Sequence, residues 1–256
     1  MLRGFAPPQT PGGRSSVVTA PPWHYAGWLL SIEYELDAGV AAAFLPEAFG
    51  RATGKAAVHV ADWQATTDGH ELVDPVYSQY KEAYVLLEAD RAGALVNFCP
   101  FMFVDQDISM VRGLLQGLPK KLGSIWLTRS YPLDHPAAAF PREGTKLGAS
   151  VAVKDRRLLQ AELQLTGAEG RPIGFLRQPT FGLLGLPTLL GGASGARPTL
   201  VRLAADDVVR GGLHAAGATL EMFPSPHDEL ADLAPLRVLE ASAGHVGLTI
   251  SRVDEP

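Results

Sequence analysis

The sequence predicts a single α+β domain built mainly on antiparallel β-sheet. Three observations favour this fold class. Glycine or proline interrupts most of the chain about every 8–12 residues, the usual spacing of turns between short strands. Apolar and polar residues alternate in segments such as Leu158–Leu165, and only a few segments carry the signals of a helix. With 256 residues and no shift in composition typical of a linker, we expect one domain over residues 23–256.

The elements follow from these signals in order along the chain. Residues 1–22 are rich in proline, glycine and serine and have no hydrophobic period, so we expect a flexible N-terminal arm. Two helices are predicted at Asp37–Phe44 and Asp107–Gly117, each beginning at an aspartate that can cap its first turn. The predicted strands are Trp28–Glu35, Ala56–Asp62, Ala83–Glu88, Leu95–Val104, Leu147–Val153 and Leu158–Leu165.

The C-terminal third is harder to interpret. The stretch Phe181–Ala196 fits neither a helix nor a strand, and two readings stay open: a turn-rich connection, or a wall or lid of an apolar pocket. A last helix is expected around Glu229–Leu233 and a last strand near Gly244–Ser251.

Composition argues against several classes of protein. The formal net charge is −5 without a basic cluster, which argues against nucleic acid as a partner. The single cysteine, Cys99, cannot form an internal disulfide, and the seven histidines are too scattered for a structural zinc site. There is no signal-peptide pattern and no apolar run long enough to span a membrane, so we expect a cytoplasmic protein without membrane contact.

The most unusual local feature is the segment Gly117–Gly123, which holds the adjacent Lys120 and Lys121 between apolar residues. Burial lowers the pKa of a lysine, by up to ~3–5 units, and a neutral amine can attack a ketone to form a Schiff base. In an extended loop the two side chains would point to opposite faces, so that only one is buried. The alternative is a pair of surface lysines on a turn.

Two further positions could serve such an amine. Glu82, at the start of an apolar strand, is a candidate acid/base partner of an imine, although exposed charges at strand ends are common. Arg112 and Gln116 lie four residues apart on the helix before the lysines and share one face. Gln116 could therefore reach a site beside Lys120, while a place on the helix surface is the ordinary alternative for both.

Taken together, these segments resemble the acetoacetate decarboxylase family. Lys120 and Lys121 follow a Gly-x-Pro turn, as in the reactive-lysine segment of that family, and Glu82 lies in a Tyr-x-Glu motif. The resemblance runs in consistent order from about Trp28 to Ile250, through Leu45–Glu47, Phe101–Asp107, Arg177–Phe181 and Gly217–Ile250. It implies an antiparallel sheet curled into a cone-like barrel around a buried pocket, with flanking helices, in a homo-oligomer that is a tetramer or larger. It also implies that Lys120 forms the imine, with Lys121 as its cationic neighbour and Glu82 facing it.

The chain also departs from the pattern of the decarboxylases. Where the family has an arginine on the first strand, this sequence has Glu35, and two carboxylates facing one pocket would repel each other. A second family glutamate lies on the following strand, where the candidates here are His59 and Asp62, and the sequence does not decide between them. We include Glu35, His59, Asp62, Gln116 and Lys121 as candidate substrate-binding residues.

The resemblance leaves several functions open. We favour a Schiff-base aldolase-dehydratase that condenses the enamine of pyruvate with an aldehyde and eliminates water, or runs in reverse. The main alternative is a decarboxylase of acetoacetate or a related β-keto acid; a non-catalytic oxo-acid binder and a cyclase are less favoured. In each catalytic case the partners are an oxo acid and, for the aldolase, an aldehyde. No cofactor is expected, because the imine itself serves as the electron sink.

Overall fold

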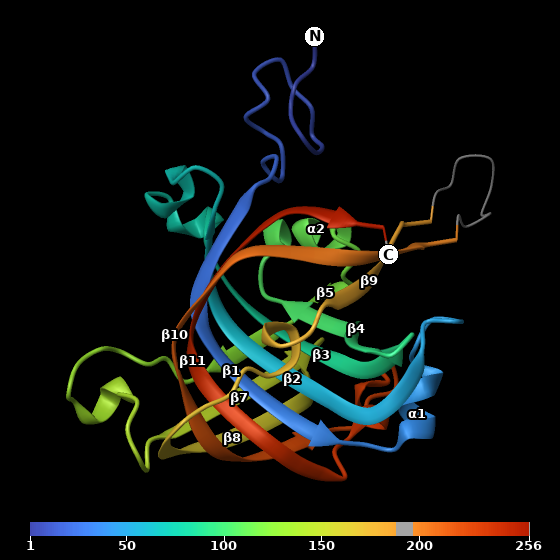
Figure 1. Ribbon diagram of the computed structural model, residues 1–256. Helices are drawn as coiled ribbons and strands as arrows, with labels where there is room; N and C mark the ends of the chain where they lie inside the picture. The colour runs from blue at the N-terminus through green and yellow to red at the C-terminus, as the bar shows by residue number, and fades with distance from the viewer. Residues whose placement is uncertain (188–196, 256) are drawn as a thin grey trace.

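The computed structural model describes residues 1–187 and 197–255, and in this part of the chain eleven strands form one sheet (Figure 1). The strands are β1 (Trp23–Glu35), β2 (Arg51–Thr66), β3 (Gln79–Arg91), β4 (Ala94–Val104), β5 (Lys120–Leu122), β6 (Ser124–Leu127), β7 (Lys146–Val153), β8 (Arg156–Glu169), β9 (Thr180–Leu184), β10 (Thr199–Met222) and β11 (Arg237–Asp254). The helices are α1 (Ala38–Ala43) and α2 (Asp107–Leu115), with short 3-10 turns at His70–Leu72, Pro75–Tyr77, Pro136–Ala138, Gly174–Leu176 and Leu230–Leu233.

The sheet closes into a ring. It runs in the order β11-β1-β2-β3-β4-β9-β10, and β10 pairs again with β11, while β8, β7 and β6 continue outward from β10. Two pairings of β4, with β5 and with β9, are parallel and the others are antiparallel. Because strands of unequal length share this ring, it wraps around the molecule without forming a regular barrel (Figure 1). The predicted α+β fold on a mostly antiparallel curled sheet is therefore confirmed.

The core occupies both faces of the ring strands. On β1 the side chains of Trp28, Leu30 and Ile32 enter the largest cluster of buried apolar residues, whereas Leu29 between them enters a second cluster. The alternation follows from the two-residue period of a strand, which sends successive side chains to opposite faces. The sequence of a strand with two buried faces is a nearly continuous apolar run, and β1 shows this pattern.

The structure contains most of the predicted helices and strands, but their first and last residues differ from the predicted ones. All six predicted strands lie within observed strands, most of which are longer, and the predicted last strand lies inside β11. Helix α1 begins as expected, because Asp37 Oδ1 accepts hydrogen bonds from the backbone N–H groups of Gly39 and Val40 at 2.8 and 2.9 Å. The helix expected near Glu229–Leu233 is only a short 3-10 turn.

Two segments of uncertain character also have a place in the fold. Part of the arm, residues 1–22, packs against the body, because Ala6 and Val18 are buried in a small cluster with Ile108 of α2. The stretch Phe181–Ala196 begins as strand β9, with Phe181 buried. The remainder of the stretch that we considered as a connection or a lid, residues 188–196, lies outside the described residues.

Candidate active site

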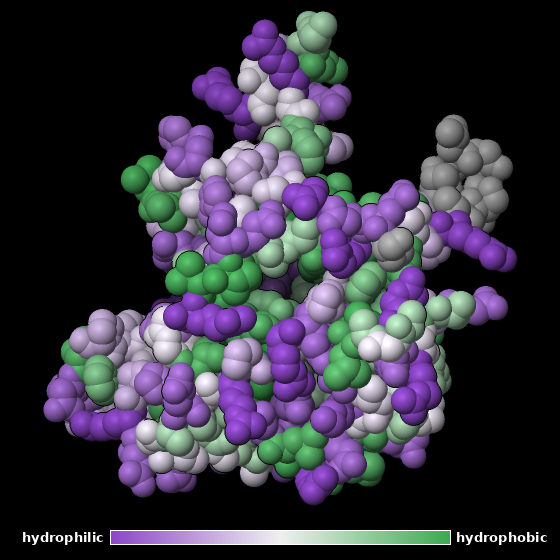
Figure 2. All heavy atoms as spheres, in the orientation of Figure 1, coloured by the Kyte–Doolittle hydropathy of each residue, from purple (hydrophilic) through white to green (hydrophobic). Residues whose placement is uncertain are grey.

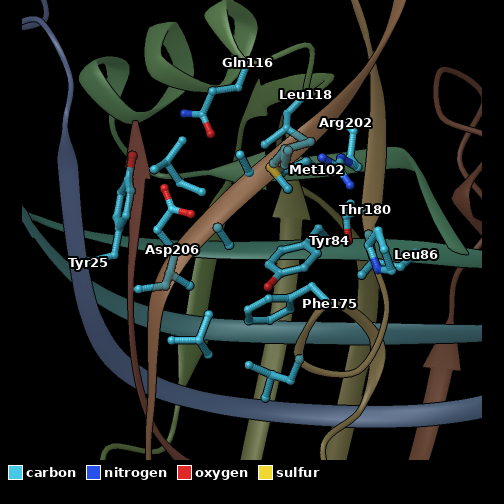
Figure 3. A pocket seen from close by; sticks show the side chains of 18 of the residues that line it. Tyr25, Tyr84, Leu86, Met102, Gln116, Leu118, Phe175, Thr180, Arg202 and Asp206 are labelled. Atoms are coloured by element: carbon cyan, nitrogen blue, oxygen red, sulfur yellow. The ribbon is translucent and has the colours of Figure 1, made fainter. Parts of the chain in front are cut away.

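A cavity of about 410 Å³ lies inside the ring, and its wall includes residues of β1, β2, β3, β4, β10 and β11 together with the end of α2 and the segment 175–180 (Figure 3). The face of the molecule in Figure 2 is hollowed near its centre, with hydrophilic and hydrophobic side chains around the hollow. A cavity of this size is typical of a small-molecule site.

Strand β3 supplies one side of the cavity through its two-residue period. Tyr80, Glu82, Tyr84 and Leu86 alternate along the strand, and all four line the cavity. At a rise of about 3.3 Å per residue, each of these side chains lies ~7 Å beyond the one before. The strand therefore places a carboxylate between two tyrosines on a single face.

Lys120 meets this carboxylate. Its Nζ lies 2.5 Å from Glu82 Oε2, and both residues are buried. The ammonium also donates a hydrogen bond of 3.0 Å to Ser109 Oγ and lies 5.5 Å from the centre of the Tyr80 ring. A lysine and a glutamate thus form a close, buried pair at the cavity wall, an arrangement that would suit a nucleophilic amine with an acid/base partner.

Helix α2 makes room for the lysine at Gly113. A β-carbon added at this glycine would lie only 2.2 Å from Cδ and 2.4 Å from Cε of Lys120. The Lys120 side chain therefore runs directly over the helix backbone at this turn. A larger residue at position 113 would force the amine out of its place.

Lys120 and Lys121 point in opposite directions, because both belong to the short strand β5. Whereas Lys120 is buried, the Lys121 side chain is 46% exposed and pairs with Asp228. Lys121 does not line the cavity.

A polar group lies at the α2 end of the cavity. Gln116 and Tyr25 both line it (Figure 3). The buried Arg112 lies one helical turn before Gln116, and Gln116 Nε2 donates a hydrogen bond of 3.0 Å to the Arg112 carbonyl oxygen. Burial raises the pKa of Tyr25 to about 12, so the hydroxyl keeps its proton at neutral pH. A protonated hydroxyl, an amide and a guanidinium behind them suit the carboxylate of an oxo acid.

Tyr84 and Phe175 form an aromatic wall further along the cavity. The two rings lie 6.0 Å apart, and behind them His59 stacks on Tyr84 at 4.9 Å and meets Phe175 edge-on at 5.1 Å. His59 is fully buried, and its Nδ1 is hydrogen-bonded to Ser31 Oγ at 2.9 Å. Burial lowers the pKa of His59 to about 3, so the ring is neutral at physiological pH.

Four of the candidate substrate-binding residues therefore lie outside the cavity lining. Glu35 is at the far end of β1, where it pairs with Arg237 at 3.0 Å. Asp62 points to the other face of β2 and pairs with Arg129 at 2.6 Å. Lys121 lies on Asp228 and His59 lies behind the aromatic wall, so of the five candidate substrate-binding residues only Gln116 lines the cavity.

Ser109 and Tyr25 were not among the candidate residues, and Arg112 was considered only as a neighbour of Gln116 on one helix face. Ser109, Arg112 and Gln116 repeat at helical spacing, and Lys120 follows four residues later, so the pattern itself could have indicated one buried helix face. Tyr25 had no comparable signal, because its contact with α2 depends on how β1 crosses the ring.

Among residues 1–187 and 197–255, no group of three or more His, Cys, Asp or Glu side chains is arranged to hold a metal ion. In the same residues, no helix is both long and apolar enough to cross a membrane.

Comparison with known proteins identifies the family. The sequence profile of the acetoacetate decarboxylase (ADC) family matches residues 6–255, nearly the whole chain. The chain belongs to the acetoacetate decarboxylase family. Members of this family are enzymes of the lyase kind, and the observed fold agrees with theirs. No curated protein matches the chain.

Several solved structures are similar to this one. The enduracididine biosynthesis enzyme MppR, complexed with pyruvate, is 29% identical, with a TM-score of 0.90 over 99% of this chain and 97% of that chain. The same enzyme complexed with the condensation product of pyruvate and imidazole 4-carboxaldehyde gives a TM-score of 0.91, over 99% and 96% of the two chains. An acetoacetate decarboxylase-like enzyme from Sphingomonas wittichii RW1 is 27% identical, with a TM-score of 0.88 over 99% of both chains.

Proposed function

We propose that the protein is a Schiff-base aldolase-dehydratase that condenses pyruvate with an aldehyde. The observation that carries the proposal is the buried pair of Lys120 and Glu82 on a cavity wall, 2.5 Å apart. The pyruvate and pyruvate-derived product in the similar enzyme MppR support the choice of oxo acid.

The first steps use Lys120 and Glu82. Glu82 accepts a proton from the Lys120 ammonium, and the free amine attacks C2 of pyruvate. Glu82 then returns this proton to the hydroxyl of the carbinolamine, which leaves as water and gives the protonated imine. Loss of a proton from the methyl group, again to Glu82, leaves the enamine. The pyruvate carboxylate lies toward Gln116 and Tyr25, with the Arg112 guanidinium behind them.

The later steps join the two substrates. The enamine carbon attacks the aldehyde carbonyl, a carbon–carbon bond forms, and the aldehyde oxygen takes up a proton to become a hydroxyl. Removal of a second proton from the former methyl carbon expels this hydroxyl as water. Hydrolysis of the imine then releases an unsaturated 2-oxo acid and restores the amine, so that one pyruvate and one aldehyde give one product and one water.

Decarboxylation of a β-keto acid is the second candidate, since the family profile that matches the chain is that of acetoacetate decarboxylase. It would use the same imine but expel carbon dioxide instead of joining an aldehyde. A homo-oligomer and a cytoplasmic location stay predictions, which size-exclusion chromatography with light scattering and cell fractionation can test.

The proposal is tested by incubating the enzyme with pyruvate and benzaldehyde and following the conjugated product in the ultraviolet. We expect product with the wild type, none with Lys120→Ala, and turnover with the matched variant Lys121→Ala. Glu82→Gln should slow the reaction by about 10²–10⁴-fold, the usual effect of losing a general acid/base. Absence of product across a panel of aldehydes, together with rapid carbon dioxide release from acetoacetate, would favour the decarboxylase.

A further inference from the structure

Pyruvate would fill only part of the cavity. A volume of about 410 Å³ lies in the range of sites for much larger ligands, ~300–1,000 Å³, and pyruvate is a three-carbon acid. Its carboxylate belongs at the polar end, beside Gln116 and Tyr25, and its carbonyl carbon at Lys120. The remaining space begins where the methyl group of pyruvate would point.

That space lies against the aromatic wall. Tyr84 follows Glu82 on the same face of β3, ~7 Å further along, and Phe175 packs beside it. Met102 and Leu118 belong to the same apolar cluster as Tyr84, and both line the cavity. In Figure 3, Tyr25 and Gln116 lie toward one side of the cavity, and Tyr84, Phe175 and Leu86 toward the other. A group attached to the enamine carbon would therefore extend over the two rings.

His59 holds this wall in place. Its ring packs against both Tyr84 and Phe175. A β-carbon at Gly174 would lie 2.3 Å from His59 Nε2, so the backbone at Gly174 also lies close against the histidine ring. Since the histidine is buried and neutral, it gives the wall a firm backing without adding charge. A preformed flat surface favours a flat ligand, because neither partner must lose further conformational freedom.

The charges around the cavity argue for a neutral ligand. Among the described residues that line the cavity, every charged side chain has a partner of opposite charge in the protein. Lys120 pairs with Glu82, Arg177 with Glu33 and Glu88, Arg202 with Asp254, and Arg252 with Asp206 and Asp254. An ionised group on the second substrate would meet no unpaired opposite charge among these described lining residues.

We propose that the second substrate is a neutral aromatic aldehyde, whose ring stacks on the wall of Tyr84 and Phe175 while its carbonyl carbon meets the enamine. This inference rests on the proposed function and adds the chemical class of the acceptor. An offset or edge-to-face ring contact contributes about 0.5–1.5 kcal/mol beyond apolar burial, which corresponds to as much as ~10-fold in kcat/KM.

The test compares four acceptors with saturating pyruvate: benzaldehyde, 4-carboxybenzaldehyde, propionaldehyde and succinic semialdehyde. Product is measured by chromatography, so that conjugation does not bias the result. We expect benzaldehyde to give the highest kcat/KM, about 10-fold above propionaldehyde, with both acidic aldehydes lower than their neutral counterparts. Equal or better rates with propionaldehyde or with an acidic aldehyde would overturn the proposal.

Phe175→Leu removes the ring while keeping an apolar side chain of similar volume. We expect the ratio of kcat/KM for benzaldehyde to that for propionaldehyde to fall several-fold. Phe140→Leu, at a half-exposed position outside the cavity, is the matched control and should keep the wild-type ratio. An unchanged ratio in folded Phe175→Leu would contradict the role of this ring.

Failure of the proposed function can be recognised separately. If borohydride traps no pyruvate adduct on the wild type, the aldolase proposal fails, and the aromatic wall is then tested without chemistry by saturation-transfer NMR with benzyl alcohol and 1-propanol. A stronger transfer to benzyl alcohol that Phe175→Leu weakens would still support an aromatic subsite. Equal transfer to the two alcohols would overturn it.

Discussion

At the scale of single residues, the site depends on where Lys120 can lie. Its amine reaches Glu82 and Ser109 only because the side chain passes over Gly113, where there is no β-carbon in its path. The adjacent Lys121, one residue further along β5, is directed to solvent and to Asp228. Two neighbouring lysines thus have different environments because a strand alternates its side chains and because one glycine leaves room on the helix.

We expect Gly113→Ala to reduce formation of the pyruvate adduct by at least about 10-fold while the fold is retained, because the new methyl group displaces the amine from Glu82. Adduct is measured by borohydride reduction and intact-protein mass spectrometry, and folding by circular dichroism. Gly217→Ala is the matched control, since a β-carbon there meets no atom within 4 Å. Wild-type adduct yield in Gly113→Ala would show that the lysine does not need this space.

At the scale of elements, the segment 174–180 between β8 and β9 joins the cavity wall to the sheet. Arg177 in this segment pairs with the buried carboxylate of Glu33 and lies 3.6 Å from that of Glu88, to which Gln178 Nε2 also donates a hydrogen bond of 2.7 Å. These contacts hold the segment that carries Phe175 against strands β1 and β3. A buried carboxylate that loses its cation is costly, so the anchor also matters for stability.

Arg177→Met should lower the free energy of unfolding by about 2 kcal/mol, less than for a fully buried pair because the arginine is partly exposed. Urea unfolding monitored by tryptophan fluorescence measures the change. Arg171→Met is the comparison, because its side chain is 82% exposed and its contact with Glu240 is 4.0 Å long; we expect a change within about 0.5 kcal/mol. Similar values for the two variants would contradict the anchoring role.

Some of these elements could be predicted from the sequence, whereas the orientation of several side chains could not. Asp37 capping α1 and the centres of the strands depend on local chemistry, so they were predicted correctly. The short helix expected near Glu229 lacks a long apolar period and is only a 3-10 turn. Positions whose orientation depends on strand register, such as Asp62 pairing with Arg129, could not be assigned to a face from the sequence, because a shift of one residue reverses every side chain.

At the scale of the whole molecule, the closed ring buries polar groups, which must be held neutral or paired. His59 is the clearest case: burial lowers its pKa from 6.5 to about 3. The unfolded chain binds a proton at this residue below about pH 6.5, and the folded chain does so only near pH 3. The unfolded state therefore binds more protons between these values, and the free energy of unfolding decreases as the pH falls through this window.

We expect His59 alone to account for a loss of about 1.6 kcal/mol in the free energy of unfolding between pH 6.5 and pH 5. His59→Gln removes the titrating group, so the variant should lose correspondingly less stability than the wild type over this range, even if it is less stable at pH 7. Urea unfolding at the two pH values measures the difference. His227→Gln, at an exposed position, should follow the wild type; the same pH dependence in His59→Gln would contradict the assignment.

We propose that Lys120 forms an imine with an oxo acid in this cavity. The most direct measurement is reduction by borohydride in the presence of pyruvate and, separately, of acetoacetate, followed by peptide mass spectrometry. We expect a reduced pyruvate adduct on the peptide that contains Lys120, at that residue and not at Lys121, and a better yield from pyruvate than from acetoacetate. An adduct at another lysine, or none from either acid, would contradict it.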